Sequence, residues 1–155
     1  MTSTALDRST GAVLPSARRI LIADDAVSSR ELLRTILERQ GYIVMEAVDG
    51  REAVDQAPQF APDLVILDLQ MPAFDGFQVM KALRETEDKD GLFILVTSAE
   101  PGHKMRSLQA GAKDFVSKPF QIPDLITRIH ALLRMKSEGE TADGEVATSK
   151  AAVQH

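Results

Sequence analysis

The sequence predicts an open, doubly wound α/β domain: a flavodoxin-like, five-stranded parallel sheet in the order 2-1-3-4-5, with helices on both faces. Short runs of consecutive apolar residues alternate with longer segments whose apolar residues recur at helical spacing. This alternation is typical of βα units that cover both faces of a parallel sheet. Five such units fit into about 115 residues, and a chain of 155 residues is long enough for one domain with a proper core.

The expected strands are five short apolar runs, at residues 20–23, 43–47, 64–67, 92–96 and 115–117. The central runs are apolar on consecutive residues, which predicts that both of their faces are buried.

The segments between these runs carry apolar stripes at helical spacing. The stripes are Leu32, Leu33, Ile36 and Leu37; Ala53, Val54 and Ala57; Phe77, Met80 and Leu83; Met105, Leu108 and Ala112; and Leu125, Ile126, Ile129, Leu132 and Leu133. Gly41 and Gly111 stand where the first and fourth helices should stop. Asp49 with Glu52, and Asp75, are expected to cap the second and third helices.

The two ends of the chain differ from its middle. Residues 1–17 are rich in Ser, Thr and Ala, and residues 137–155 contain no large aliphatic side chain beyond two valines. Neither end can bury enough apolar surface to offset its ordering entropy. We therefore predict a flexible N-terminal segment (1–17), one folded domain (18–136) and a flexible acidic tail (137–155).

Composition excludes several classes of function. The net charge of −5 argues against a general nucleic-acid binder, and the absence of cysteine excludes disulfides, zinc–thiolate sites and cysteine catalysis. No apolar stretch approaches the roughly 20 residues of a membrane span, and residues 1–17 lack the apolar core of a secretory signal. We expect a cytoplasmic protein that inserts into no membrane.

Polar side chains stand at the carboxyl ends of four expected strands. Asp24 and Asp25 follow the first strand, Asp68 the third, Thr97 the fourth and Lys118 the fifth. Ligands of open parallel sheets bind outside these ends, near the point where the strand order reverses. Strands 1 and 3 are neighbours in the expected order, so the acidic pair and Asp68 should share one pocket.

This combination predicts phosphoryl chemistry with a divalent metal. Three close carboxylates repel one another, and Mg²⁺ bound by carboxylate oxygens relieves the repulsion. Lys118 provides a positive charge for a phosphate, and Thr97 can donate a hydrogen bond to a phosphoryl oxygen. Asp68 is then the natural nucleophile, and the product is an aspartyl phosphate.

Taken singly, these residues have ordinary explanations. An acid between a strand and a helix is most often an N-cap, and Lys118 alone would be a solvated surface lysine. The joint pattern favours a site, because independent caps would not place an acidic pair, a nucleophile, a hydroxyl and a cation at neighbouring strand ends.

The same motifs make the chain resemble the receiver domain of two-component response regulators over roughly residues 18–136. The matching segments are ADD at 23–25, DLQMPAFDG at 68–76, TS at 97–98 and AGAKDFVSKPF at 110–120. The resemblance implies that Asp68 is phosphorylated by a histidine kinase or a histidine phosphotransfer protein. It also implies that Mg²⁺ is bound by Asp25, Asp68 and the backbone carbonyl of Gln70, with Asp24 acting partly through water.

The resemblance also assigns a switch. It implies that Thr97 and Lys118 contact the phosphoryl group, that the Lys118–Pro119 peptide bond is cis, and that Phe115 occupies the aromatic switch position. Phosphorylation would then change the surface formed by helix 4, strand 5 and helix 5, at residues 102–134. Phe115 lacks the hydroxyl of the more usual tyrosine, so we expect its inward, buried rotamer to be favoured.

We expect a stand-alone signalling receiver rather than an enzyme. Its partners would be the phosphodonor and a downstream target protein, and it would be a monomer or a phosphorylation-dependent dimer. One alternative is the receiver part of a larger regulator, because the segment after Arg134 resembles a linker. A weaker alternative is a haloacid-dehalogenase-type phosphatase, which needs an acid/base aspartate where this chain has Gln70 and a cap domain for which the chain has no room.

Overall fold

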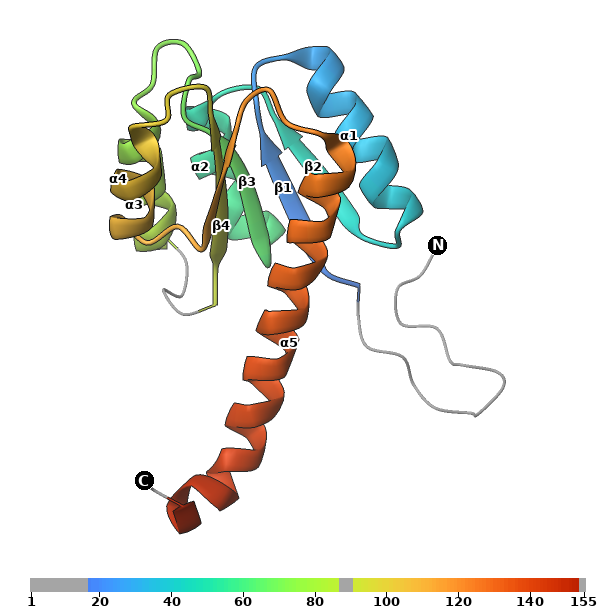
Figure 1. The fold of residues 1–155 in the computed structure, drawn as a ribbon, viewed down its shortest axis with the longest axis vertical. Coiled ribbons are helices and arrows are strands. Elements are labelled where there is room, and N and C mark those ends of the chain that lie inside the picture. The colour runs from blue at the N-terminus through green and yellow to red at the C-terminus, as the bar shows by residue number, and fades with distance from the viewer. Residues whose placement is uncertain (1–16, 87–90, 154–155) are drawn as a thin grey trace.

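The computed structural model describes residues 17–86 and 91–153, with side chains described up to residue 139 except that of Thr86. Strands and helices alternate along this part of the chain (Figure 1). The strands are β1 (Arg19–Ala23), β2 (Ile43–Ala47), β3 (Leu64–Asp68), β4 (Phe93–Ser98) and β5 (Asp114–Ser117); the helices are α1 (Val27–Arg39), α2 (Gly50–Phe60), α3 (Gly76–Thr86), α4 (His103–Gln109) and α5 (Ile122–Val153).

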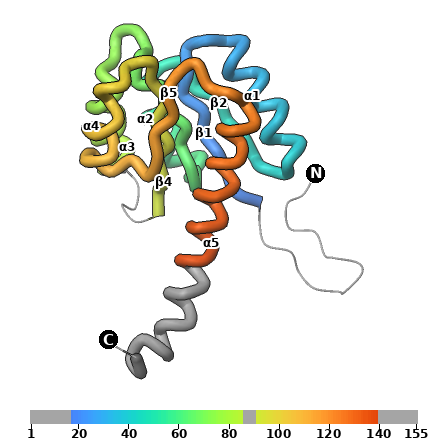
Figure 2. Tube along the Cα trace, in the orientation of Figure 1, coloured from blue at the N-terminus to red at the C-terminus, as the bar shows by residue number. Residues whose placement is uncertain are grey.

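All strand pairs are parallel, and the sheet order is β2-β1-β3-β4-β5, so the predicted fold class and topology are confirmed. Helices α1 and α5 cover one face of the sheet, and α2 and α3 cover the other, with α4 beside α3 (Figures 1 and 2). The carboxyl ends of the strands meet at one edge, which is the edge where α1 begins.

The alternation of side chains along each strand divides the core between these two layers. Ile20 and Ile22 pack with Leu33 and Leu37 of α1 and with the apolar stripe of α5. Their neighbours on β1 face the layer of α2 and α3 instead. Because β3 and β4 are buried along their whole length, residues at their ends are held by packing on both faces.

Helix ends follow the expected chemistry. The Asp49 carboxylate accepts a hydrogen bond from the backbone N–H of Glu52, and the Glu52 carboxylate accepts one from that of Val48, so both side chains cap the start of α2. Gly41 and Gly111 adopt φ angles of 97° and 110° after α1 and α4, which only glycine adopts readily.

Two features differ from the sequence prediction. The helix α4 is present, but its apolar stripe is not its buried face: Met105 is 64% exposed and Leu108 38%, whereas Ser107 is fully buried. The helix α5, whose apolar stripe ends at Leu133, continues past residue 137 to Val153, while the flexibility of residues 137–155 stays a prediction. This stretch contains no proline and several good helix formers, such as Ala, Glu and Lys. The predicted flexible N-terminal segment lies, apart from Ala17, outside the described residues.

Gly76, the first residue of α3, allows the close approach of the loop that follows β3. A Cβ added at Gly76 would lie 2.7 Å from the Cα atom and 2.5 Å from the Cδ2 atom of Leu69. We expect Gly76→Ala to lower the free energy of unfolding by about 1–3 kcal/mol through overpacking, although alanine is the better helix former. Urea denaturation measures this change. Gly102→Ala is the control, because no atom lies within 4 Å of its added Cβ; equal effects of the two substitutions would contradict the packing explanation.

Candidate functional site

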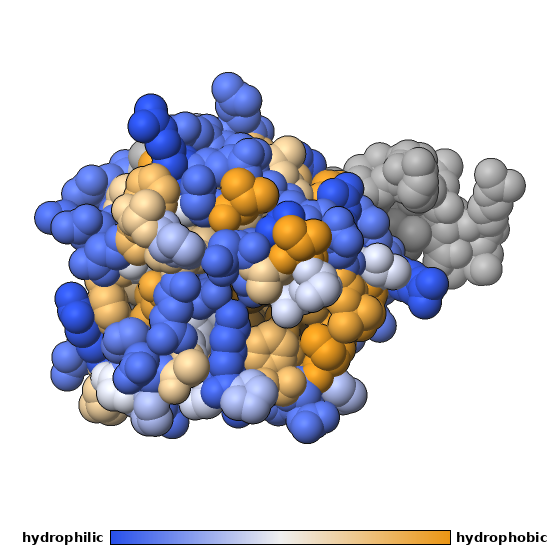
Figure 3. Space-filling model, turned by 90° about the horizontal axis from the view of Figure 1, so that it is seen from above, coloured by the Kyte–Doolittle hydropathy of each residue, from blue (hydrophilic) through white to orange (hydrophobic). Residues whose placement is uncertain are grey.

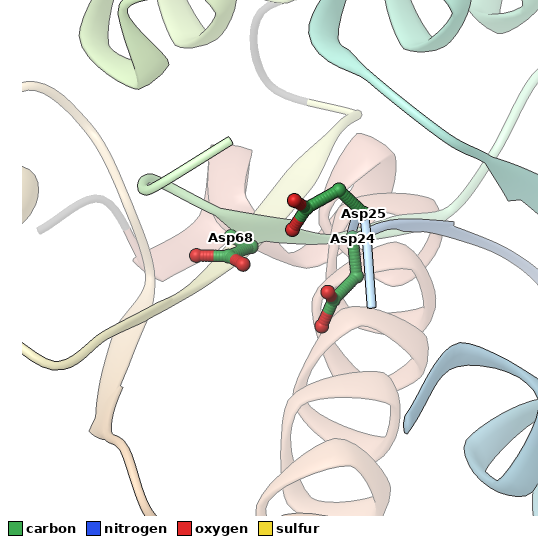
Figure 4. A group of neighbouring side chains, drawn as sticks. All are labelled: Asp24, Asp25 and Asp68. Atoms are coloured by element: carbon green, nitrogen blue, oxygen red, sulfur yellow. The ribbon is translucent and has the colours of Figure 1, made fainter. Parts of the chain in front are cut away.

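Three carboxylates converge at the carboxyl edge of the sheet, where β1 and β3 lie side by side. Asp24 and Asp25 follow the end of β1, and Asp68 is the last residue of β3. Figure 4 shows the three side chains gathered at these strand ends, and one oxygen of each lies within 4.8 Å of the others. Asp24 and Asp68 are buried and Asp25 is exposed, so the cluster is open to solvent on the Asp25 side.

Local hydrogen bonds orient the two buried carboxylates. The backbone N–H of Ala26 donates to Asp24 Oδ1 at 2.8 Å, and that of Gln70 donates to Asp68 Oδ1 at 2.9 Å. These are Asx turns, in which a carboxylate bonds to the backbone two residues further on. Each buried carboxylate therefore presents its Oδ2 atom to the other groups of the site.

Lys118 reaches both of these oxygens from the loop after β5. Its Nζ atom lies 2.8 Å from Asp68 Oδ2 and 3.5 Å from Asp24 Oδ2. The Lys118 backbone N–H donates to the Ser98 carbonyl at 2.8 Å, and the Lys118–Pro119 peptide bond is cis, as the sequence resemblance implied. The ammonium group thus stands over the carboxylate that the sequence singles out as nucleophile.

Burial and neighbouring charges set the protonation of this pair. Burial raises the pKa of the Asp24 carboxyl, and the charge of Asp68 raises it further. The hydrogen bond from the Ala26 N–H and the charge of Lys118 lower this pKa, but by less, so it is raised overall. Burial would by itself lower the pKa of Lys118, but the hydrogen bond to Asp68 and the charges of Asp68 and Asp24 raise it overall. Lys118 is therefore cationic at neutral pH, whereas ionisation of Asp24 destabilises the folded protein.

Thr97 and Phe115 lie close by in the sheet. Thr97 on β4 pairs in register with Asp68 and is 2% exposed, and its carbonyl accepts a hydrogen bond from the Leu69 N–H. Phe115 on β5 is 5% exposed and packs in the core layer of α2 and α3. The preference of Phe115 for the inward rotamer and the switch role of Thr97 and Phe115 stay predictions.

The structure also shows contacts that sequence reasoning missed. Gln70 Oε1 accepts a hydrogen bond from the Ala99 N–H at 2.6 Å and so ties the loop after β3 to the loop after β4. Ser98 Oγ lies 2.8 Å from His103 Nδ1 and accepts a bond from the Glu100 N–H. No periodicity in the sequence signals such bonds, because they depend on loop conformation.

The donor set suits a hard divalent cation. The three convergent side chains offer carboxylate oxygens, which Mg²⁺ prefers, and the exposed Asp25 leaves room for water ligands. A bound cation would also offset the burial and the charge of Asp68, which together raise the Asp24 pKa. The residues present therefore fit a magnesium ion.

A pocket of about 450 Å³ lies beside the carboxylates. Its polar lining residues are Asp24, Ser29, Thr97 and Lys118, and most of its wall is apolar. The apolar lining residues are Ala23, Leu32, Leu33, Ile66, Ala99, Pro119, Phe120 and Ile122. Figure 3, which looks onto this edge of the sheet, shows apolar side chains exposed among hydrophilic ones.

Asp24→Asn is expected to stabilise the metal-free protein at neutral pH. The pKa of Asp24 is higher in the folded than in the unfolded protein. The protonated carboxyl therefore adds to the stability of the fold below the unfolded pKa, and this contribution is lost as the pH rises through the folded pKa. The asparagine side chain is neutral at every pH, so it can accept the Ala26 hydrogen bond without losing stability as the pH rises. Thermal unfolding in EDTA should show a melting temperature a few degrees higher at pH 7, and the gain should disappear at acid pH.

Asp75→Asn is the control for this change, since Asp75 is exposed and asparagine can replace it as a cap of α3. An unchanged or lower melting temperature for Asp24→Asn at pH 7 would contradict the destabilisation that we assign to the buried Asp24 charge.

Comparison with known proteins agrees with this geometry. The acidic cluster and the lysine lie at the carboxyl edge of a parallel α/β sheet, which is where ligands of such sheets bind. The family described as "Response regulator receiver domain" matches residues 20–130. The chain belongs to this family, whose members are signalling proteins that work with kinases and downstream targets.

Individual relatives are similar over most of this chain. Response regulator MprA of Mycobacterium sp. (strain KMS) is 40% identical over 130 residues, which cover 84% of this chain and 56% of the relative. MprA of Mycolicibacterium vanbaalenii is 41% identical over 124 residues, which cover 80% of this chain and 54% of the relative. The chain thus spans little more than half the length of these curated relatives.

Solved structures match the fold. Chemotaxis protein CheY4 of Vibrio cholerae is 31% identical with a TM-score of 0.69, and the match covers 75% of this chain and 98% of that one. A CheY-like receiver domain protein of Methanospirillum hungatei is 25% identical with a TM-score of 0.74, covering 80% and 99%. Within the part of the chain that the structure describes, no helix is both long and apolar enough to cross a membrane.

Proposed function

We propose that this receiver accepts a phosphoryl group on Asp68 from a phosphohistidine of a histidine kinase or phosphotransfer protein, with Mg²⁺ bound at the acidic cluster. The observation that carries the proposal is the contact between Lys118 Nζ and Asp68 Oδ2 at 2.8 Å, beside two further carboxylates. A buried strand-end carboxylate with a cation on one side and a metal-type donor set on the other is suited to phosphoryl transfer.

The chain's own residues supply position and charge. A carboxylate oxygen of Asp68 attacks the phosphorus, the bond from phosphorus to the donor imidazole breaks, and its electron pair returns to that nitrogen. The Lys118 ammonium stands where negative charge then accumulates, and the Thr97 hydroxyl can donate to a phosphoryl oxygen. Asp24, Asp25, Asp68 and the Gln70 carbonyl would hold Mg²⁺, which when bound neutralises charge on the phosphoryl oxygens.

The phosphodonor is expected to approach over this edge of the sheet, because the cluster around the buried Asp68 is open to solvent at the exposed Asp25. Leu32 of α1 is 51% exposed and lines the pocket that opens beside the carboxylates. An apolar rim next to a charged site suits a protein donor better than a small one. The rim therefore supports a protein as the source of the phosphoryl group, while the cytoplasmic location stays a prediction.

Phosphorylation would change the surface formed by α4, β5 and α5, to which a target protein binds. Thr97 lies next to Val96, which pairs with Phe115 in the register of β4 and β5. A movement of Thr97 toward a phosphoryl group would thus change the surroundings of the Phe115 ring on the neighbouring strand. The exposed Met105 and Leu108 of α4 give this surface apolar groups that a target protein, or a second copy of the chain, can cover.

The length of the relatives favours one alternative organisation. Because the curated relatives extend well beyond the matched region, the chain can be the receiver part of a larger regulator with an output domain. A stop codon directly after the His155 codon in the gene would exclude an output domain that follows the receiver. The phosphatase alternative has no such support, since the chain belongs to a signalling family and Gln70 replaces the aspartate that it requires.

The experiment that tests the proposal is incubation of the purified chain with acetyl phosphate, followed by intact-mass measurement. With Mg²⁺ the mass should increase by a single phosphoryl group, and with EDTA it should remain unchanged. An absence of any adduct with Mg²⁺, or equal adducts with and without the metal, would overturn the proposal.

A further inference from the structure

Arg30 is a buried arginine of α1 that reaches the loop carrying the acidic pair. The residue is 7% exposed, and its Nη1 atom donates a hydrogen bond of 2.8 Å to the backbone carbonyl of Asp24. That carbonyl belongs to the peptide bond between Asp24 and Asp25. The guanidinium group therefore acts on the backbone that joins two of the three convergent carboxylates.

Glu46 of β2 holds this guanidinium in place. Arg30 Nε lies 2.6 Å from Glu46 Oε1, and the second carboxylate oxygen accepts a bond of 2.9 Å from Arg34 Nη1. Burial alone would raise the Glu46 pKa, but the hydrogen bonds from Arg34 and Arg30 lower it overall, so Glu46 stays ionised. Burying an arginine costs free energy unless a carboxylate pairs with its charge. Here the Glu46 carboxylate on β2 is that partner.

The loop has few other restraints beyond β1. The N-cap residue of α1 is Ala26, which has no side chain to cap the helix. The Asp24 N–H donates to the Ala47 carbonyl at 3.2 Å, and the Ala26 N–H bonds to the Asp24 carboxylate. Among these contacts, the hydrogen bond from Arg30 is the one made to the Asp24 carbonyl. This bond therefore fixes the orientation of the peptide group that leads to Asp25.

We infer that Arg30 is a positioning residue for the metal site: clamped by Glu46, it holds the Asp24–Asp25 peptide so that the exposed Asp25 carboxylate converges with Asp24 and Asp68. The inference rests on the proposed function, because it presupposes that the cluster binds Mg²⁺. Groups of this kind, which hold the ligands rather than the ion, typically change metal affinity by about 10- to 100-fold when removed.

The test is Mg²⁺ binding by isothermal titration calorimetry on the full chain. Arg30→Ala should raise the Mg²⁺ dissociation constant by at least about tenfold, and Arg30→Lys should recover part of the loss, since an ammonium can donate to the Asp24 carbonyl. Arg34→Ala is the matched control: it removes the other arginine from Glu46 but none of the contacts to Asp24. Its dissociation constant should stay within about twofold of wild type.

A second readout separates positioning from general destabilisation. In phosphorylation by acetyl phosphate, Arg30→Ala should raise the Mg²⁺ concentration for half-maximal rate but keep most of the rate at saturating Mg²⁺. If Arg30→Ala does not fold, Arg30→Lys and Glu46→Gln undergo the same titration, and a weaker Mg²⁺ affinity in both is expected.

Wild-type affinity in the folded Arg30 variants would overturn the inference and leave the proposed function standing. Equal losses in Arg30→Ala and Arg34→Ala would also overturn it, because the effect would then belong to Glu46 and not to the Asp24 carbonyl. If the wild-type chain itself neither binds Mg²⁺ nor accepts phosphate, the proposed function fails, and the inference fails with it.

Discussion

Asp68→Asn is expected to carry no phosphate after incubation with acetyl phosphate and Mg²⁺, under conditions in which the wild-type chain is phosphorylated. Asparagine keeps the size of the side chain and can still accept the Gln70 N–H bond, but its amide is not a nucleophile at neutral pH. Asp24 and Asp25 do not replace it, because Asp68 is the one of the three that lies on β3 in register with Thr97, with its Oδ2 atom 2.8 Å from Lys118 Nζ. Intact-mass measurement over a time course checks this result.

The control is Asp75→Asn, which removes an exposed carboxylate a short way along the same loop and preserves its hydrogen bond to the Phe77 N–H. This variant should be phosphorylated at the wild-type rate. An undiminished adduct on Asp68→Asn would show that another residue is the acceptor, and loss of the adduct in both variants would show that the loop, not the nucleophile, had been damaged.

Lys118→Met should reduce the phosphorylation rate by about 100-fold or more, the usual cost of removing one charge-stabilising donor. Methionine retains much of the length and apolar stem of lysine, so packing around the loop after β5 is largely kept. It also leaves Asp24 and Asp68 without their cation. The metal-free variant should therefore melt at a lower temperature, and saturating Mg²⁺ should restore more stability to it than to wild type.

The rate is measured by quenched mass spectrometry and the stability by thermal unfolding with EDTA or Mg²⁺. Lys113→Met serves as the control, because Lys113 lies over the ring of Phe93 and away from the acidic cluster. If Lys118→Met is phosphorylated as fast as Lys113→Met, Lys118 has no part in charge stabilisation.

Much of this fold could be predicted because its signals are local. Five apolar runs marked the strands, and β3 and β4 were expected to be buried on both faces, as they are. Parallel topology then placed Asp24, Asp68 and Lys118 at the same edge, since the carboxyl ends of all strands lie together. The sequence could therefore indicate which side chains meet, although their roles stay predictions.

Other features depend on contacts between distant elements, which periodicity does not show. The apolar residues of α4 looked like a buried stripe, but the short helix turns Ser107 inward and leaves Met105 exposed. Arg30 of α1 is also buried, although nothing in the apolar spacing of that helix marks it. Its burial follows from Glu46 on β2, sixteen residues further along the chain, and spacing within α1 could not reveal that partner.

The continuation of α5 had a different cause. Residues from 137 onward contain too few large apolar side chains to predict packing, and we inferred flexibility from that shortage. Helix formation needs only favourable local propensity once a packed helix precedes it, because the costly nucleus already exists. The apolar stripe of α5 from Leu125 to Leu133 provides that nucleus.

The most direct test of the central claim is peptide mapping of the wild-type chain after incubation with acetyl phosphate and Mg²⁺. The predicted result is a hydroxylamine-labile phosphoryl group on the peptide that spans the end of β3, assigned by fragmentation to Asp68. A phosphoryl group on any other residue, or one that resists hydroxylamine as a serine or threonine phosphate does, would contradict it.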